Sequence, residues 1–197
     1  MKNIALAAAF AAAILTPGVA SAQAIPGAIV AVVDLEKVTG QCTACKTATA
    51  ALQGQVNALK SREQALAAPL KTEGESIQAA VNALQGKEPD AALQARVKAF
   101  QTKQQQGAQE LQRQQTQIQR NQAYISQQIQ AKLNPIYSQV MQRRGANVLV
   151  EVGNTLAAGA ALDVTNDVLT ALNAALPSVS TTAPAQAAPA QQQPQGR

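Results

Sequence analysis

The sequence predicts a mostly helical α+β protein, in which a long antiparallel helical hairpin, or coiled-coil arm, stands on a small β-rich body. Ala, Gln, Leu and Lys, which favour helices, are abundant, whereas aromatic residues make up only 2% of the chain and cannot fill a wide interior. Apolar residues recur at alternating steps of four and three through the middle of the chain. Short β-branched runs lie on either side of that middle segment.

The first 22 residues have the pattern of a secretory signal peptide. They contain Lys2, an apolar run at residues 4–15 that is too short to cross a bilayer, and a small-residue cleavage pattern that ends at Ala22. We therefore expect an exported, soluble protein that is cleaved after Ala22. Cleavage would leave 15 basic and 11 acidic residues, so the net charge would fall from +5 to +4. Such mild basicity favours acidic partners or anionic head groups, or is simply a solvated surface; without a basic cluster interleaved with aromatics, nucleic acid is not an expected partner.

Two segments, residues 23–42 and 145–176, are expected to form the body. The run at residues 29–33 predicts a buried strand that Asp34 ends, and alternating valines at residues 148–152 predict another. Gly153 and Asn154 would then turn the chain into a further strand at residues 155–158.

A short helix is predicted to close the body. Thr165 is its expected N-cap, and Asp167 lies favourably in its first turn. Its apolar face consists of Val168, Leu169, Leu172 and Leu176.

Residues 43–144 predict the hairpin arm, and a turn at residues 85–90 contains Gly86 and Pro89. The apolar seam is weak, because Pro69 and Pro135 should kink the helices and polar residues occupy several seam positions, Gln104, Gln114 and Asn121 among them. Two interpretations stay open: a poorly optimised coiled coil, or an arm that must bend and splay.

Residues 101–130 contain 14 glutamines. Glutamine is uncharged and both donates and accepts hydrogen bonds, so such a helix could contact many polypeptide backbones without selecting one. Compositional drift towards a solvated helix face explains the same residues. By contrast, residues 177–197 are rich in Pro, Ala, Gln, Ser and Thr, and we expect a disordered tail there.

Cys42 and Cys45 are the only cysteines of the chain and have C-x-x-C spacing. Haem attachment would need a histidine where Lys46 stands, and a closed zinc site would need two more ligands in a chain without histidine. A thioredoxin-like dithiol would need a β-α-β surround, which the alanine-rich segment that follows does not predict. We favour an intrachain disulfide at the start of the arm, and a bridge between subunits stays open.

The order of these elements resembles that of the Skp/OmpH family of periplasmic chaperones for outer-membrane proteins. The resemblance covers about residues 29–176, and its most specific segments are IVAVVDLEKV and ANVLVEVGNTLAAGAALDVTNDVLTAL. It implies a homotrimer in which three chains pool their strands in one trimerisation body, from which three arms surround a cavity. It further implies an ATP-independent holdase of the periplasm that encloses unfolded outer-membrane proteins, without cofactor, metal or catalytic residues.

Basic residues near the arm tip are candidates for contact with such clients or with anionic lipid or lipopolysaccharide surfaces: Lys71, Lys87, Arg96, Lys98 and Lys103. Apolar tip residues could touch clients too, although closing the hairpin seam is the favoured role for them: Ile77, Val81, Leu84, Leu93 and Val97. Arg143 and Arg144, at the end of the returning helix, suit its C-terminal dipole as readily as a ligand. Two other classes stay as alternatives, namely a structural coiled-coil spacer of the cell envelope and a C-x-x-C dithiol oxidoreductase.

Overall fold

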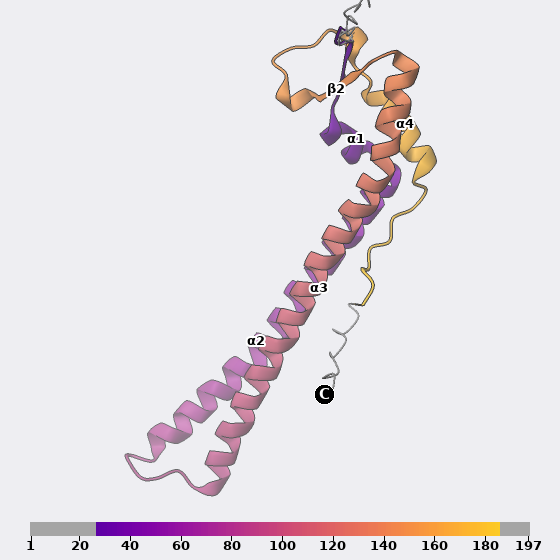
Figure 1. Ribbon diagram of the computed structural model, residues 1–197. Helices are drawn as coiled ribbons and strands as arrows, with labels where there is room; N and C mark the ends of the chain where they lie inside the picture. The colour runs from indigo at the N-terminus through magenta and orange to yellow at the C-terminus, as the bar shows by residue number, and fades with distance from the viewer. Residues whose placement is uncertain (1–26, 186–197) are drawn as a thin grey trace, which may run out of the picture.

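A computed structural model describes residues 27–185. Its elements follow in the order β1 (Val30–Val33), α1 (Leu35–Gln41), α2 (Thr43–Ala83), α3 (Ala91–Arg144), β2 (Val148–Glu151) and α4 (Thr165–Ala175), with short 3-10 helices at Val152–Asn154 and Ala160–Leu162. Helices α2 and α3 form a long hairpin that extends from a body built by the other elements (Figure 1). The predicted fold class, mostly helical α+β with an antiparallel hairpin, is confirmed. The expected signal peptide lies outside the described residues.

The sheet of the body consists of β1 and β2, which pair in parallel with Val30 opposite Val148 and Val33 opposite Glu151. The whole hairpin is therefore the crossover between two parallel neighbours. On its other side β1 makes one further bridge, from Val32 to Asp163. In the part of the chain that is described, the outer edge of β2 is unpaired.

Residues 155–158 do not form the expected strand. The Glu151 carboxylate accepts the Gly153 N–H at 2.9 Å, and the Thr155 hydroxyl donates to the Val152 carbonyl at 2.8 Å. These local hydrogen bonds satisfy the backbone in a 3-10 turn, so the chain leaves the sheet directly after β2.

The expected strand at residues 29–33 ends where Asp34 begins a helix that the sequence did not predict. The Asp34 carboxylate accepts the Lys37 N–H at 2.7 Å and caps α1, a helix of seven residues. A helix this short has only two turns, which is too few to show an apolar period in the sequence.

Helix α4 begins at the expected place, but Thr165 has a different role from the predicted N-cap. The Thr165 hydroxyl accepts the Asp34 N–H at 2.9 Å, and the Asp163 carboxylate accepts the Thr165 N–H at 2.8 Å. The hydrogen bonds from Thr165 lower the pKa of Asp163 below its usual value. The N-cap position is Val164, which makes no side-chain capping hydrogen bond. Asp163 instead accepts the first N–H of the helix, and Thr165 ties α4 to the end of β1.

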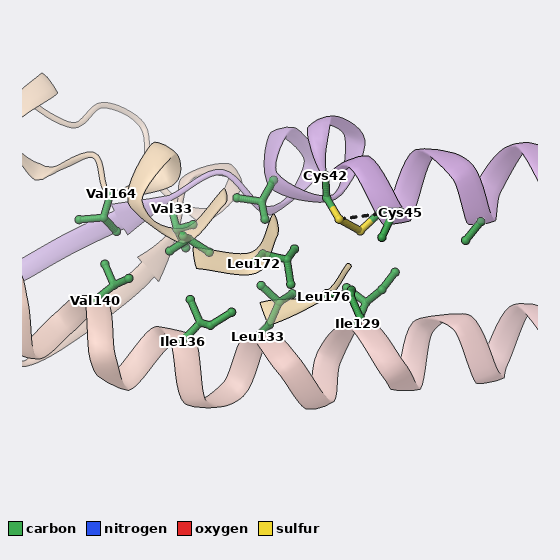
Figure 2. Close-up of a cluster of buried hydrophobic side chains, with 14 of the residues drawn as sticks. Val33, Cys42, Cys45, Ile129, Leu133, Ile136, Val140, Val164, Leu172 and Leu176 are labelled. Carbon is green, nitrogen blue, oxygen red and sulfur yellow. Dashed lines mark hydrogen bonds between the residues drawn. A yellow bond between two sulfur atoms is a disulfide. The ribbon is translucent and has the colours of Figure 1, made fainter. Parts of the chain in front are cut away.

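The core lies where the body meets the root of the hairpin (Figure 2). Val33, Val164 and Leu172 from the body face a row of buried side chains along α3. That row consists of Ile125, Ile129, Leu133, Ile136 and Val140. Two polar contacts join α4 to the arm: Arg144 pairs with Asp167 at 2.7 Å, and the Asn173 side chain accepts the Thr43 N–H at 3.0 Å. The root of the arm is thus held by both apolar and polar contacts.

Candidate functional site

The surface of the hairpin is the candidate functional site. Helix α2 has 41 residues and α3 has 54, which correspond to about 60 and 80 Å at the α-helical rise. At the tip, Gln85 and Gly86 adopt positive φ angles of 48° and 89°, and the Asp90 carboxylate caps α3 by accepting the Leu93 N–H at 2.8 Å. At the other end α3 stops at Gly145, whose φ of 67° suits glycine. Both helices continue through their prolines, Pro69 and Pro135.

Charged side chains close the seam in the middle of the arm. Arg62 on α2 donates two hydrogen bonds to the Glu110 carboxylate on α3, at 2.7 and 2.9 Å. This contact, chiefly through its hydrogen bonds, holds the pKa of Glu110 below its usual value and raises that of Arg62. Nearer the tip, Lys103 pairs with Glu73 at 2.8 Å. The distal seam therefore combines solvent-accessible ion pairs with few buried residues, such as Ile77 and Gly107, whereas the root has a continuous row of buried aliphatic side chains.

Small residues let the two helices approach each other at two places, one between these ion pairs and one on the tip side of the Lys103–Glu73 pair. Gly107 is buried against Leu66, and Gly74 lies against the ring of Phe100. A Cβ at Gly74 would stand 3.3 Å from the Phe100 ring, whereas one at Gly107 would stand 3.7 Å from Leu66. Of these two glycines, only Gly74 would require its neighbour, the Phe100 ring, to shift by a few tenths of an ångström to admit a methyl group.

The structure separates the five basic candidates near the tip. Lys103 is paired with Glu73, Lys71 lies 3.9 Å from Glu75, and Arg96 donates to the Ser76 hydroxyl at 2.7 Å. Lys87 and Lys98 are exposed and make no ion pair with any of the residues described.

The apolar tip residues divide between the two roles considered for them. Ile77 is buried in the seam, and Leu84, Leu93 and Val97 are half-buried. Val81 is 41% exposed and, with Leu93, Val97 and Lys98, lines an open groove of about 470 Å³. The tip thus offers an apolar groove beside an unpaired ammonium group.

A second open groove, of about 460 Å³, lies at the root of the arm. Its apolar lining comes from α1, α2 and α3 and includes Leu35, Leu52, Ile129, Leu133 and Tyr137. Burial raises the pKa of the Tyr137 hydroxyl. The arm therefore carries apolar grooves near both ends, and Arg62 and Glu110 border a further groove between them.

Cys42 and Cys45 form a disulfide at the junction of α1 and α2. Their Cα atoms are 5.1 Å apart, and the two residues are 0% and 2% exposed within the apolar core (Figure 2). A reactive dithiol is usually partly exposed and electropositive, so this setting is that of a structural bond. Among residues 27–185 no cluster of metal-ligating side chains occurs.

The C-terminal segment differs from the expectation of disorder beyond Pro177. Residues 177–185 leave α4 and run beside the hairpin (Figure 1), where Gln55, Arg120, Asn121 and Gln128 hydrogen-bond to them. Composition alone did not reveal this contact, because the partners of the segment lie more than 50 residues away in the chain. The glutamine-rich sequence of α3 was the only signal for it.

No helix in the described part of the chain is both long and apolar enough to span a membrane.

Comparisons with known proteins agree with this architecture. The model of a family described as outer membrane protein (OmpH-like) matches residues 29–172. A solved structure from Caulobacter crescentus CB15, assigned as an outer membrane chaperone (OmpH-like), superposes with a TM-score of 0.64 at 20% identity, over 80% of this chain and 89% of that one. At 20% identity, this similarity supports a shared fold and nothing more. The search of curated proteins found no match.

Proposed function

The chain belongs to the OmpH-like family of outer membrane proteins, and on that premise we propose that it is an ATP-independent holdase chaperone of the periplasm. Its clients would be unfolded outer-membrane proteins, which it would keep from aggregating until they are inserted. The observation that carries the proposal is the free-standing arm, which offers open apolar grooves near its root and tip. An unfolded barrel strand alternates apolar and polar residues and can place its apolar side chains in such grooves.

The proposed assembly is a homotrimer joined through the bodies. Its support is the apolar surface that a single chain leaves exposed there: Leu156 is fully exposed at 109%, and Val148, Val152 and Leu162 are each more than one third exposed. These residues accompany the unpaired edge of β2, and a two-stranded sheet is marginal alone. Three arms on one body would surround a cavity, and sedimentation equilibrium of the mature chain would test the number of chains.

The direct test of the function is light scattering. A urea-unfolded outer-membrane barrel is diluted into buffer with or without the purified mature chain and without ATP. A few-fold excess of trimer should suppress the scattering. Unchanged scattering for several barrels at low salt would overturn the holdase proposal and favour a structural spacer of the envelope.

Lys87 and Lys98 are the proposed contacts for acidic client segments or anionic head groups, because Lys71, Arg96 and Lys103 already have partners. Replacing both by glutamine should slow client association at low salt several-fold, since unpaired charges steer encounter. Lys71→Gln is the matched control, an exposed lysine already near a carboxylate. Equal rates in all three proteins would exclude steering by the tip.

A further inference from the structure

Residues 177–185 lie on the arm in the manner of a bound peptide. Val179, Thr181 and Ala183 are half-buried, whereas Ser178, Ser180 and Thr182 are exposed. This alternation resembles that of an extended strand with one face against a surface, although the segment bends at Thr182. Figure 1 shows the segment descending from α4 along the hairpin.

The hydrogen bonds that join this segment to the arm all end on main-chain atoms of the segment, as far as the described residues show. The Gln128 side chain donates to the Ser180 carbonyl at 2.9 Å and accepts the Ser180 N–H at 3.0 Å. A single glutamine thus reproduces the pair of bonds that a residue makes in a β-ladder. Gln55 donates to the Thr181 carbonyl at 3.1 Å, and Arg120 donates to the Pro184 carbonyl.

Asn121 completes the surface and is oriented independently of the segment. Its carboxamide oxygen accepts the Ala183 N–H at 2.8 Å and the Gln117 side-chain N–H at 2.8 Å, while its amino group donates to Gln55 at 2.7 Å. Asn121 is only 3% exposed. Because two arm residues hold this amide in place, the groups that receive a peptide are arranged in advance.

A surface of this kind recognises an extended backbone and not a particular sequence. The half-buried side chains of the segment are those of Val179, Thr181 and Ala183. A peptide bound in the same way would therefore need only small or medium side chains at alternate positions. Strands of an outer-membrane barrel alternate their side chains in the same way. Gln55, Arg120, Asn121 and Gln128, which we call the amide strip, therefore suit the class of client proposed above.

We propose that the amide strip is a binding site for extended segments of unfolded client proteins, and that the chain's own residues 177–185 occupy it until a client displaces them. The inference rests on the proposed holdase function and deepens it. A tethered segment has a high effective concentration, so it raises the apparent Kd of every competitor. The tail would then act as a built-in competitor that only clients with several extended segments overcome.

The first test compares client binding by the full mature chain and by a chain that ends at Leu176. A fluorescently labelled, urea-unfolded outer-membrane barrel is titrated and its anisotropy followed. The shortened chain should bind about three- to tenfold more tightly, and a synthetic peptide of residues 177–197 should return its Kd towards that of the full chain. Equal or weaker binding by the shortened chain would overturn the inference.

A second pair of variants keeps the full length, since Val179 packs against the core and its loss could disturb the body. Ser180→Pro removes the N–H that Gln128 accepts. Thr182→Pro changes an exposed residue whose N–H makes no hydrogen bond within residues 27–185. Ser180→Pro should tighten client binding several-fold, and Thr182→Pro should leave it unchanged. The same response from both variants would contradict a specific role of Gln128.

The strip itself is tested in the chain that ends at Leu176. Gln128→Ala should weaken client binding several-fold, while Gln127→Ala, an exposed neighbour, should not. If every form binds the client and the tail and strip variants have no effect, the inference fails and the holdase function stands. If no form binds the client or suppresses its aggregation, the proposed function fails, and the inference fails with it.

Discussion

The root and the distal half of the arm consist of the same two helices, yet they are held together differently. At the root, Ile129, Leu133, Ile136 and Val140 are each at most 9% exposed and pack against the body. Farther out, Arg62 with Glu110 and Lys103 with Glu73 close the seam in contact with water, and among the described residues Ile77 is the one large aliphatic side chain buried there. Buried aliphatic side chains stabilise strongly and exposed ion pairs weakly. The arm should therefore have a rigid base and a soft end that opens first.

The largest difference is expected between two leucine truncations, one in the part of the body that packs against the root of the arm and one at the tip. Leu172 is fully buried in the body, so Leu172→Ala should lower the free energy of unfolding by about 2–5 kcal/mol through lost burial and a cavity. Leu93 is half-buried at the tip, so Leu93→Ala should cost far less. Urea denaturation followed by circular dichroism measures both, and equal costs would contradict a soft distal arm.

The disulfide should contribute less than the apolar core. Its loop spans only four residues, so replacing Cys42 and Cys45 by alanine should lower stability by about 2 kcal/mol. Reductant should have a similar effect on the natural chain. Suppression of aggregation should survive the double substitution at temperatures where the variant stays folded, and its loss there would favour the dithiol alternative.

Glycine substitutions test the packing of the arm more finely. Gly54→Ala meets no atom within 4 Å and should stabilise helix α2 by about 0.5–1 kcal/mol. Gly74→Ala should gain less or destabilise, because its Cβ would stand 3.3 Å from the Phe100 ring. Thermal melts of the two variants would compare them directly. If Gly74→Ala stabilised the protein as much as Gly54→Ala, the Phe100 ring and its neighbours in the distal seam would have to shift at little energetic cost.

The smallest effect should come from acid. The pKa of Glu110 is lowered in the folded arm, so its contribution is complete above its unfolded value of about 4.3 and is lost as the pH falls through the folded pKa. Amide exchange in the distal arm should therefore become faster below about pH 4, relative to the intrinsic rate. Asp163 in the body responds in the same direction, and Glu110→Gln isolates the part that belongs to the arm. If the protection of distal-arm amides from exchange does not change below about pH 4, the predicted role of Glu110 is wrong.

Local signals in the sequence account for the arm. The alternating apolar steps predict both long helices, and the glycine and proline near residues 86–89 predict the turn between them. These features depend on neighbours a few positions apart, so they can be recognised without knowledge of the rest of the chain. The five basic tip residues were likewise visible, but only the structure separates Lys87 and Lys98 from the three that have partners.

By itself, the sequence determined the helical arm, the turn at its tip and the β-branched segments that meet as β1 and β2. Only the tertiary structure decided their parallel register, the role of Thr165 in joining α4 to β1, and the path of residues 177–185 along the arm. The physical reason is the range of the interactions. Helical periodicity repeats every few residues, whereas each of the other features pairs groups that lie between about 50 and 130 positions apart and meet only when the chain has folded.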